Sequence, residues 1–211
     1  MLASGSYHQA MTLRQRFGAG FLGMYRLAVR ARGKSFSVLA GGAFAAFGAR
    51  SVLQPPVRLS GEKRIAVGSD VFVGAGSWLQ VLGHAPGGIA LSIGDGTSIA
   101  GNCVLSAASS IRLGEKVLVA RGVYVSDHIH AYEDPSRPVL DQGIDRVAPV
   151  EIEDGAWLGE NVVICPGVRI GRGAVIGANA VVLEDVPDHA LAVGVPAKVV
   201  RYFAERRAPV L

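Results

Sequence analysis

The sequence has few charged residues and few cysteines for its length. Only 18% of its 211 residues are charged, against roughly 25% in an average soluble domain, while 50% are hydrophobic. This composition excludes a disordered chain, because such chains are polar and rich in charge. The two cysteines, Cys103 and Cys165, lie too far apart to indicate the disulfide framework of a small secreted domain. We therefore expect a folded domain in a reducing compartment, the cytoplasm.

The sequence also lacks a hydrophobic run near its N-terminus that could cross a bilayer. The longest uncharged stretch there, residues 35–49, has 15 residues and three glycines, whereas a spanning helix needs about 20 apolar residues. Acidic residues are scarce in the same region, since residues 1–64 hold ten Lys and Arg but one Glu. Residues 65–197 carry a net charge of −8 and residues 198–211 one of +3. No recognisable nucleic-acid-binding module accompanies the basic segment, so we expect no nucleic-acid partner.

Glycine, in contrast, is abundant, at 28 of 211 residues, and it accompanies a repeat. So much glycine excludes a coiled coil, because each glycine weakens a helix by roughly 1 kcal/mol relative to alanine. From residue 67 onward an Ile, Leu or Val recurs every six residues, often followed by glycine, with interruptions between groups of coils. The aliphatic positions are Val67, Val73, Leu79, Ile93, Ile99, Leu105, Leu113, Val119, Val125, Ile152, Leu158, Ile164, Ile170, Ile176 and Val182.

A six-residue period predicts short strands joined by tight turns. Three hexapeptides close a triangular coil of 18 residues, and successive coils stack by parallel strand pairing about 4.8 Å apart. The aliphatic side chain points inward, and three residues later the chain turns, often with positive φ. The turn positions hold residues that tolerate that conformation: Gly76, Gly96, Asn102, Gly122, Gly155, Asn161, Gly167, Gly173 and Asn179. We predict an all-β fold, a parallel β-helix of about five coils.

The spacing between coils locates three insertions. Eight extra residues fall near 83–88, two between Ile93 and Leu113, and 21 between Leu113 and Ile152, roughly over 127–149. We expect function in the longest insertion, because loops on a rigid scaffold commonly carry it. The predicted organisation is a basic helical or extended segment over 1–64, a β-helix over 65–197 with the inserted loop 127–149, and a basic tail over 198–211.

The repeat resembles a known family over residues 65–203. Residues 152–187 read IEDGAWLGENVVICPGVRIGRGAVIGANAVVLEDVP, and AVGVPAKVVR follows at 192–201, with SDHIH at 126–130. These segments resemble the hexapeptide-repeat acyltransferases, in the branch of sugar O-acetyltransferases that includes galactoside, maltose and polysaccharide acetyltransferases. The resemblance implies a left-handed β-helix, a homotrimer with active sites between subunits, and acyl transfer to a sugar or glycoside hydroxyl.

In the resembled family a histidine in the place of His128 removes the proton from the acceptor hydroxyl. A neutral imidazole suits this task, because its pKa lies near working pH. His130 is the alternative base, and Asp127 is a candidate to orient an imidazole. The activated oxygen is expected to attack the thioester directly, because Cys103 and Cys165 occupy repeat positions and are interpreted as packing residues.

The resemblance also implies coenzyme A as the carrier of the donor acyl group, acetyl by default, with no metal required. The residues that match the family's coenzyme A contacts are Trp157, Glu160, Ala178, Lys198 and Arg201. Lys and Arg suit phosphate recognition because they donate several charge-assisted hydrogen bonds. The sequence departs from the family at Leu183 and Glu184, where a Thr-Lys pair is usual and where a carboxylate would repel phosphate.

The acceptor site is less specified. The polar and aromatic residues of the long loop are the candidates, namely Tyr132, Asp134, Arg137 and Gln142. The galactoside enzymes carry paired Asp residues where this chain has Ala107 and Ala108, which leaves the identity of the acceptor open.

The basic N-terminal segment predicts an amphipathic helix over residues 11–33. Leu13, Phe17, Phe21, Met24 and Ala28 recur at helical spacing, with arginines among them. Two roles fit such a helix. It can cover the open first coil, whose strand edges would otherwise be unpaired, or it can make peripheral contact with the inner surface of a membrane.

Two other functions share this fold class. A metal enzyme such as the γ-class carbonic anhydrases, which the coil pattern also resembles, would require three convergent histidines. His128 and His130 are too close in sequence to match the usual spacing there, and His84 lies in another loop. A β-helix can also serve as a non-catalytic binding or assembly module.

Overall fold

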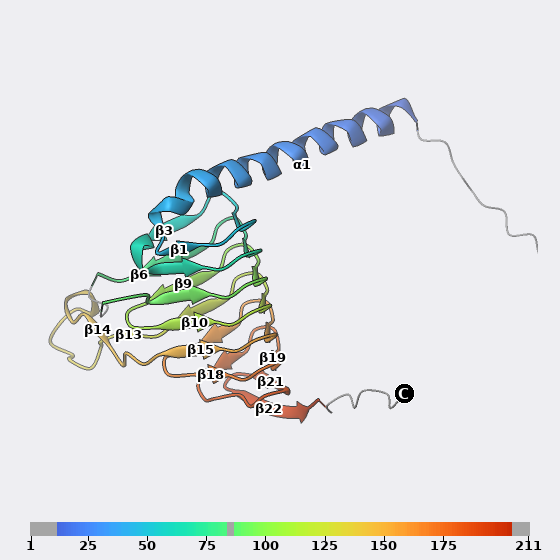
Figure 1. Cartoon of the computed structure of the whole chain (residues 1–211). Helices are drawn as coiled ribbons and strands as arrows, with labels where there is room; N and C mark the ends of the chain where they lie inside the picture. The colour runs from blue at the N-terminus through green and yellow to red at the C-terminus, as the bar shows by residue number, and fades with distance from the viewer. Residues whose placement is uncertain (1–11, 84–86, 204–211) are drawn as a thin grey trace, which may run out of the picture.

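The computed structural model describes residues 12–83 and 87–203, which form one long helix and a stack of short strands (Figure 1). Helix α1 (Leu13–Ala40) stands at one end of the stack, and most strands form three sheets, paired in parallel within the coil stack, that face one another across the core. Sheet 1 contains β1 (Ala46–Phe47), β4 (Ile65–Val67), β7 (Leu91–Ile93), β10 (Ile111–Leu113), β15 (Val150–Ile152) and β18 (Arg169–Ile170).

The other two sheets complete each coil. Sheet 2 contains β2 (Val52–Leu53), β5 (Phe72–Val73), β8 (Ser98–Ile99), β11 (Leu118–Val119), β16 (Trp157–Leu158), β19 (Val175–Ile176), β21 (Ala190–Gly194) and β22 (Ala197–Tyr202). Sheet 3 contains β3 (Arg58–Ser60), β6 (Trp78–Val81), β9 (Val104–Ala107), β12 (Tyr124–Ser126), β17 (Val163–Ile164) and β20 (Val181–Val182). One strand from each sheet makes a coil, so the predicted parallel β-helix is confirmed.

The repeat positions behave as the period predicts. All fifteen aliphatic side chains between Val67 and Val182 are buried, with at most 3% of their surface exposed. The nine predicted turn residues all have positive φ, between 55° and 81°. Glycine after the aliphatic position is required by the close approach of successive coils: a Cβ on Gly94 would lie 2.5 Å from the carbonyl carbon of Gly114. The glycine excess is therefore largely a consequence of the coil geometry.

The coil stack is longer than the repeat predicted. It begins at Ala46 instead of residue 65, because Phe47, Leu53 and Leu59 pair in register with Val67, Val73 and Leu79. The stack therefore has six complete coils instead of about five. The same six-residue spacing is present in this first coil, but an aromatic residue replaces the aliphatic one at Phe47.

The C-terminal boundary also differs from the expectation. Residues 197–202 form strand β22, which pairs antiparallel with β21 at the edge of sheet 2. The first five residues of the segment expected to be a tail, 198–202, are therefore part of the sheet. Residues 204–211 lie outside the described residues.

The three predicted insertions all lie at one corner of the triangular stack, the corner between sheets 3 and 1. The first is residues 82–90 after β6, and the longest is residues 127–149 after β12. Between them, the longer strands β9 and β10 take up the two extra residues and leave only 108–110 at the corner. The corners between sheets 1 and 2 and between sheets 2 and 3 hold four residues in each of the six coils. The longest insertion contains β13 (Ile129–His130), a short 3₁₀ turn (Val139–Asp141) and β14 (Ile144–Asp145), with β13 and β14 paired antiparallel.

Helix α1 covers the first coil with its C-terminal part only. It begins at the N-cap Thr12, whose side chain and that of Gln15 form a capping box. Near its other end the Ser37 hydroxyl accepts a hydrogen bond from the Leu53 N–H at 2.8 Å and donates one to the Gly33 carbonyl. Residues 13–28 project beyond the stack (Figure 1). Within the residues described, no helix has the length and hydropathy needed to cross a membrane.

Candidate active site

Asp127 lies at the point where strand β12 leaves the coil and enters the long loop. Its side chain is fully buried and accepts hydrogen bonds from three consecutive backbone N–H groups, those of Ala108, Ser109 and Ser110, each at 2.7 Å. These three residues form the corner between β9 and β10 in the preceding coil. Their N–H groups form an array that holds the carboxylate.

His128 is held by Asp127. Its Nδ1 lies 2.9 Å from Asp127 Oδ1, and the imidazole is nearly buried, with 8% of the residue exposed. Asp127 accepts from three N–H groups and so acts as a carboxylate acceptor, which favours the tautomer with the imidazole proton on Nδ1. The lone pair then lies on Nε2, the nitrogen that a general base needs. Ser126 adds a bond from its hydroxyl to the His128 carbonyl at 2.7 Å.

A cavity of about 220 Å³ lies beside this imidazole. Its lining comprises Tyr124, Ser126, His128, Ile129, His130, Ile164, Cys165 and Pro166. His130, the alternative base, therefore shares the cavity, but it is exposed on β13 and its ring has no hydrogen-bond partner among the described residues. The geometry singles out His128 as the oriented imidazole.

The two cysteines differ in their surroundings. Cys103 is fully buried in the core, as its repeat position predicts. Cys165 is half-buried and lines the cavity beside His128, which its repeat position did not indicate. Burial raises the pKa of the Cys165 thiol, which favours the protonated and unreactive form.

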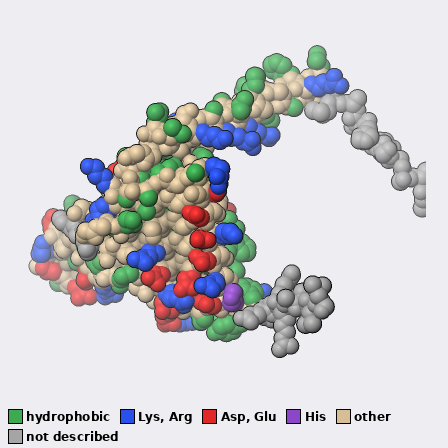
Figure 2. Space-filling model, in the orientation of Figure 1, with side chains coloured by type: hydrophobic (Ala, Val, Ile, Leu, Met, Phe, Trp, Pro, Cys, Tyr) green, Lys and Arg blue, Asp and Glu red, His purple; other side chains and the backbone are tan. Residues whose placement is uncertain are grey.

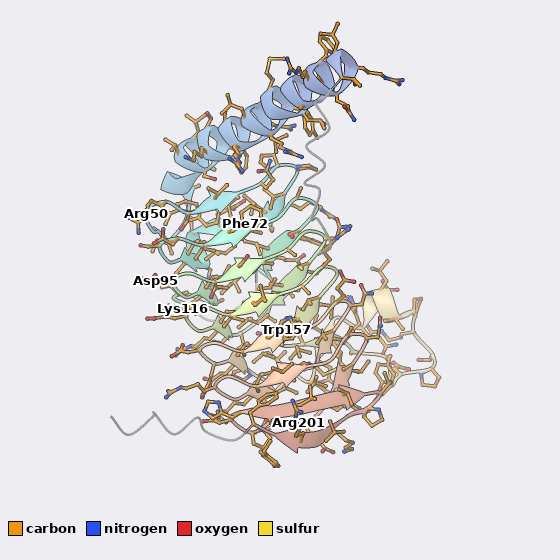
Figure 3. All side chains as sticks on the ribbon, turned by 90° about the vertical axis from the view of Figure 1, so that its right-hand side faces the viewer. Arg50, Phe72, Asp95, Lys116, Trp157 and Arg201 are labelled. Atoms are coloured by element: carbon orange, nitrogen blue, oxygen red, sulfur yellow. The ribbon has the colours of Figure 1, made fainter. Side chains whose placement is uncertain are left out.

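The residues matched to coenzyme A contacts lie on sheet 2 and at its corner with sheet 3. Trp157, on the outer face of β16, is aligned by strand register with Val175, Leu191 and finally Arg201 on β22. Figure 3 shows Phe72, Trp157 and Arg201 along this one face. Glu160 and Ala178 are exposed at the corner between sheets 2 and 3, in adjacent coils.

The basic residues of β22 have close neighbours. Lys198 Nζ lies 3.0 Å from Glu184 Oε2, and the Arg201 guanidinium lies 5.1 Å from the centre of the Phe203 ring. Glu184 therefore faces a cation and is not an isolated carboxylate. The pair is exposed, so its contribution to stability is small, about 0–1 kcal/mol.

One chain does not bring the histidine and the coenzyme A candidates together. His128 lies at the corner between sheets 3 and 1, whereas Glu160 and Ala178 lie at the corner between sheets 2 and 3. The strands of sheet 3 separate the two corners. Trp157 and Arg201 lie on the outer face of sheet 2, beyond that second corner from His128.

The acceptor candidates of the loop are largely engaged with one another. The Gln142 amide bonds the backbone of Asp134 and the carbonyl of Arg137, and Arg137 donates to the Asp141 carbonyl. Hydrogen bonds from Ser136 lower the pKa of Asp134. These contacts hold the loop in shape. Tyr132 is 54% exposed, with the Arg146 guanidinium 5.9 Å from its ring centre.

The metal-enzyme alternative requires a cluster of ligands. Over residues 12–83 and 87–203, no group of three His, Cys, Asp or Glu side chains could hold a metal ion. His84, the third histidine that this alternative invoked, lies outside the described residues.

Two family profiles match segments of the coil stack. The family described as "Bacterial transferase hexapeptide (six repeats)" matches residues 149–184, and "Hexapeptide repeat of succinyl-transferase" matches residues 90–127. Both segments consist of the coils that flank the long loop. The predicted hexapeptide repeat is thereby confirmed.

Individual proteins match over longer segments. The chain is 28% identical over 158 residues to WbbJ of Escherichia coli, which is named for O-acetyl transfer in lipopolysaccharide biosynthesis. This match covers 72% of the present chain and 79% of WbbJ. A hexapeptide-repeat acetyltransferase of Vibrio cholerae, solved with acetyl coenzyme A, is 30% identical with a TM-score of 0.59, over 80% of this chain and 76% of that one. A galactoside acetyltransferase solved with coenzyme A is 27% identical with a TM-score of 0.59, over 81% and 70%.

The matches to the first curated relatives span only 37% and 47% of those proteins' lengths, at 40% and 39% identity. The match to the Vibrio cholerae enzyme nevertheless extends through most of both chains. The family resemblance of the sequence is confirmed, and so is the left-handed β-helix that it implied. This chain belongs to the hexapeptide-repeat acetyltransferase family.

Proposed function

We propose that this protein transfers an acyl group, acetyl by default, from acyl-coenzyme A to a hydroxyl of a sugar or glycoside. The observation that carries the proposal is the imidazole of His128, which is oriented by the buried Asp127 through Nδ1 and lines a cavity. The acetyl coenzyme A bound to the Vibrio cholerae relative and the names of the Escherichia coli and galactoside relatives support the donor and the acceptor class.

His128 Nε2 takes the proton of the acceptor hydroxyl as the oxygen attacks the thioester carbonyl. Asp127 stabilises the imidazolium that forms, because its carboxylate bonds Nδ1. When the tetrahedral intermediate collapses, the carbon–sulfur bond breaks and the imidazolium returns the proton to the leaving sulfur. A backbone N–H is expected to stabilise the oxyanion meanwhile. No protein nucleophile is required.

The coenzyme A contacts follow the outer face of sheet 2 and its corner with sheet 3. The pantetheine arm lies along the coils 157–185, past Trp157, Glu160 and Ala178, and the phosphates meet Lys198 and Arg201. Both cations are exposed at the last strands of the stack. Because Lys198 is paired with Glu184, binding of a phosphate there requires that this pair be broken or shared.

The active site lies between two copies of the chain in a homotrimer. One chain places His128 and the coenzyme A contacts on separate corners, so a neighbouring copy supplies the second set. Sheet 2 offers an apolar surface for such a contact, because Phe72, Leu118 and Trp157 are 41%, 49% and 48% exposed on its outer face. Leu118 and Trp157 are direct neighbours in register, and Ser98 separates them from Phe72. Large exposed apolar patches commonly mark interaction sites.

The long loop supplies the acceptor site. Tyr132 offers an exposed aromatic face of the kind on which a sugar ring packs. Asp134, Arg137 and Gln142 hold the loop through their mutual hydrogen bonds and present their remaining polar atoms at its surface.

The test is a panel of acyl-coenzyme A donors against sugar and glycoside acceptors. The reaction is measured by the release of free thiol, and the product is identified by its mass. His128→Ala is expected to lower kcat/KM by a factor of about 10²–10⁴, the usual contribution of a general base. His130→Ala is the matched control, an imidazole from the same cavity without an orienting carboxylate, and is expected to lower it less than about tenfold.

Subunit mixing tests the shared site. His128→Ala chains mixed with Lys198→Ala chains are expected to recover activity, because mixed trimers contain some sites in which both contributions are intact.

Undiminished transfer by His128→Ala would show that the base is wrongly assigned. Absence of thiol release with every acceptor would instead favour the non-catalytic binding module.

A further inference from the structure

The projecting part of α1 carries an exposed hydrophobic row. Leu13, Phe17, Phe21 and Met24 follow one another at intervals of three and four residues and so share one helix face. Their exposed fractions are 85%, 79%, 58% and 67%. We name these four side chains the apolar stripe. A helix face of this size is normally covered in a folded protein.

The coil stack does not cover the apolar stripe. Where α1 touches the first coil it does so through Gly33 and Ser37, which are buried on another face of the helix. The helical spacing of the stripe continues to Val38 beside that contact, and Val38 is still 82% exposed. Figure 2 shows hydrophobic side chains on the upper side of α1, away from the stack, and Lys and Arg mainly below them.

The charges of α1 are all of one sign. The helix contains six cations, Arg14, Arg16, Arg26, Arg30, Arg32 and Lys34, and no Asp or Glu. None of these six forms an ion pair with any described residue of the chain. The helix therefore combines an uncovered apolar face with cations that lack anionic partners.

We propose that α1 docks on the surface of an anionic lipid bilayer. The apolar stripe enters the boundary between head groups and acyl chains, and the cations meet lipid phosphates. A second α1 helix is a poorer partner, because packing two stripes together would bring twelve cations close without a single carboxylate on either helix. Anionic lipid supplies both the apolar and the negatively charged surface that this helix lacks within its own chain.

Vesicle flotation with the full chain tests the proposal. The protein is expected to float with vesicles of phosphatidylcholine and phosphatidylglycerol, and much less with phosphatidylcholine alone. Added salt should weaken the association. Each removal of a cation, as in Arg14→Gln or Arg16→Gln, is expected to weaken binding by about fivefold. Phe17→Ser with Phe21→Ser should weaken it by at least about tenfold.

Leu140→Ser is the matched control, because Leu140 is a similarly exposed leucine, at 87%, in the long loop and not on the helix. It is expected to leave vesicle binding unchanged. Circular dichroism establishes that the Phe17 and Phe21 variant keeps its fold, and transfer to a soluble acceptor, which does not involve α1, separates this proposal from the catalytic one. Equal binding to both vesicle types, or binding that survives loss of the two Phe side chains, overturns the proposal. If the Phe17 and Phe21 variant changes the oligomeric mass of the protein but not its vesicle binding, the proposal is also overturned, and the apolar stripe instead contacts a second copy of the chain.

Discussion

The corners of the coil stack differ in how freely their length varies. The corners between sheets 1 and 2 and between sheets 2 and 3 hold four residues in every coil, whereas the corner between sheets 3 and 1 ranges from three residues at 108–110 to 23 at 127–149. Strand register is nevertheless preserved across the longest excursion, since Ile111 pairs with Val150 and Tyr124 with Val163. The constant corners thus fix the stack, and the variable corner is free to carry the site.

Two successive segments of the variable corner are coupled at one residue. Asp127 starts the longest segment, and its carboxylate is held by the three N–H groups of the shortest one, in the preceding coil. The position of His128 is therefore set by two successive coils and not by the rest of the loop. The following predictions test whether the variable corner is as rigid at Asp127 as the constant corners are throughout.

Asp127→Ala is expected to have the largest effect. It removes the only side-chain acceptor seen among the described residues for three N–H groups, one buried and two partly buried. An unsatisfied buried donor costs about 1–3 kcal/mol. We expect the free energy of unfolding, measured in urea, to fall by about 3 kcal/mol or more. Loss of the orienting partner should lower kcat/KM by about a hundredfold in the remaining folded protein.

Asp134→Ala is the control, because Asp134 lies in the same loop but bonds Ser136 at the surface. Its cost in stability should stay below about 1 kcal/mol. If Asp127→Ala unfolds at the same urea concentration as the parent, the carboxylate does not hold this corner.

Two glycine substitutions in the constant corner should have intermediate effects. A Cβ on Gly94 would lie 2.5 Å from the backbone of the next coil. A Cβ on Gly155 would meet open space, but the backbone there has a φ of +68°, which disfavours any residue with a Cβ. Gly94→Ala is expected to cost about 2–3 kcal/mol through crowding, and Gly155→Ala about 1 kcal/mol through its backbone conformation. Urea unfolding distinguishes them.

The Gly155→Asn variant separates the two causes, because Asn102, Asn161 and Asn179 already adopt positive φ at equivalent turns. It should be more stable than Gly155→Ala. Activity per folded molecule is expected to stay within about twofold in all three variants, since the corner between sheets 1 and 2 is remote from His128. An Ala at position 94 that costs nothing would contradict the close packing of the coils.

The regular coils were predictable from sequence because their determinants are local. An inward aliphatic residue and a glycine or asparagine three residues later specify each strand and turn, and the long-range contacts then follow from stacking. The first coil was missed because Phe47 departs from the aliphatic pattern, although Leu53 and Leu59 keep its spacing.

The site was less predictable because its contacts cross between coils. The sequence identified Asp127 and His128 as candidates, but the resting place of the carboxylate depends on backbone groups at Ala108 and its neighbours, which carry no side-chain signal. The contact of Glu184 with Lys198 arises from the antiparallel return of β22, which the repeat does not encode. Cys165 is placed near His128 by the register of β12 with β17, in which Val125 pairs with Ile164.

Cys165→Ala is expected to have the smallest effect, and it tests whether the variable corner supplies a nucleophile as well as a base. Burial raises the pKa of the Cys165 thiol, so the thiol form dominates at neutral pH and alkylation by iodoacetamide should accelerate only as pH rises toward that raised pKa. In direct transfer the cysteine is dispensable, and kcat/KM should change by less than about threefold. Iodoacetamide is nevertheless expected to inactivate the parent protein and spare Cys165→Ala, because the added group fills a cavity of about 220 Å³ that His128 shares. Loss of transfer in Cys165→Ala, with a covalent acyl adduct at Cys165 of the parent protein, would replace direct attack by a two-step reaction at the same corner.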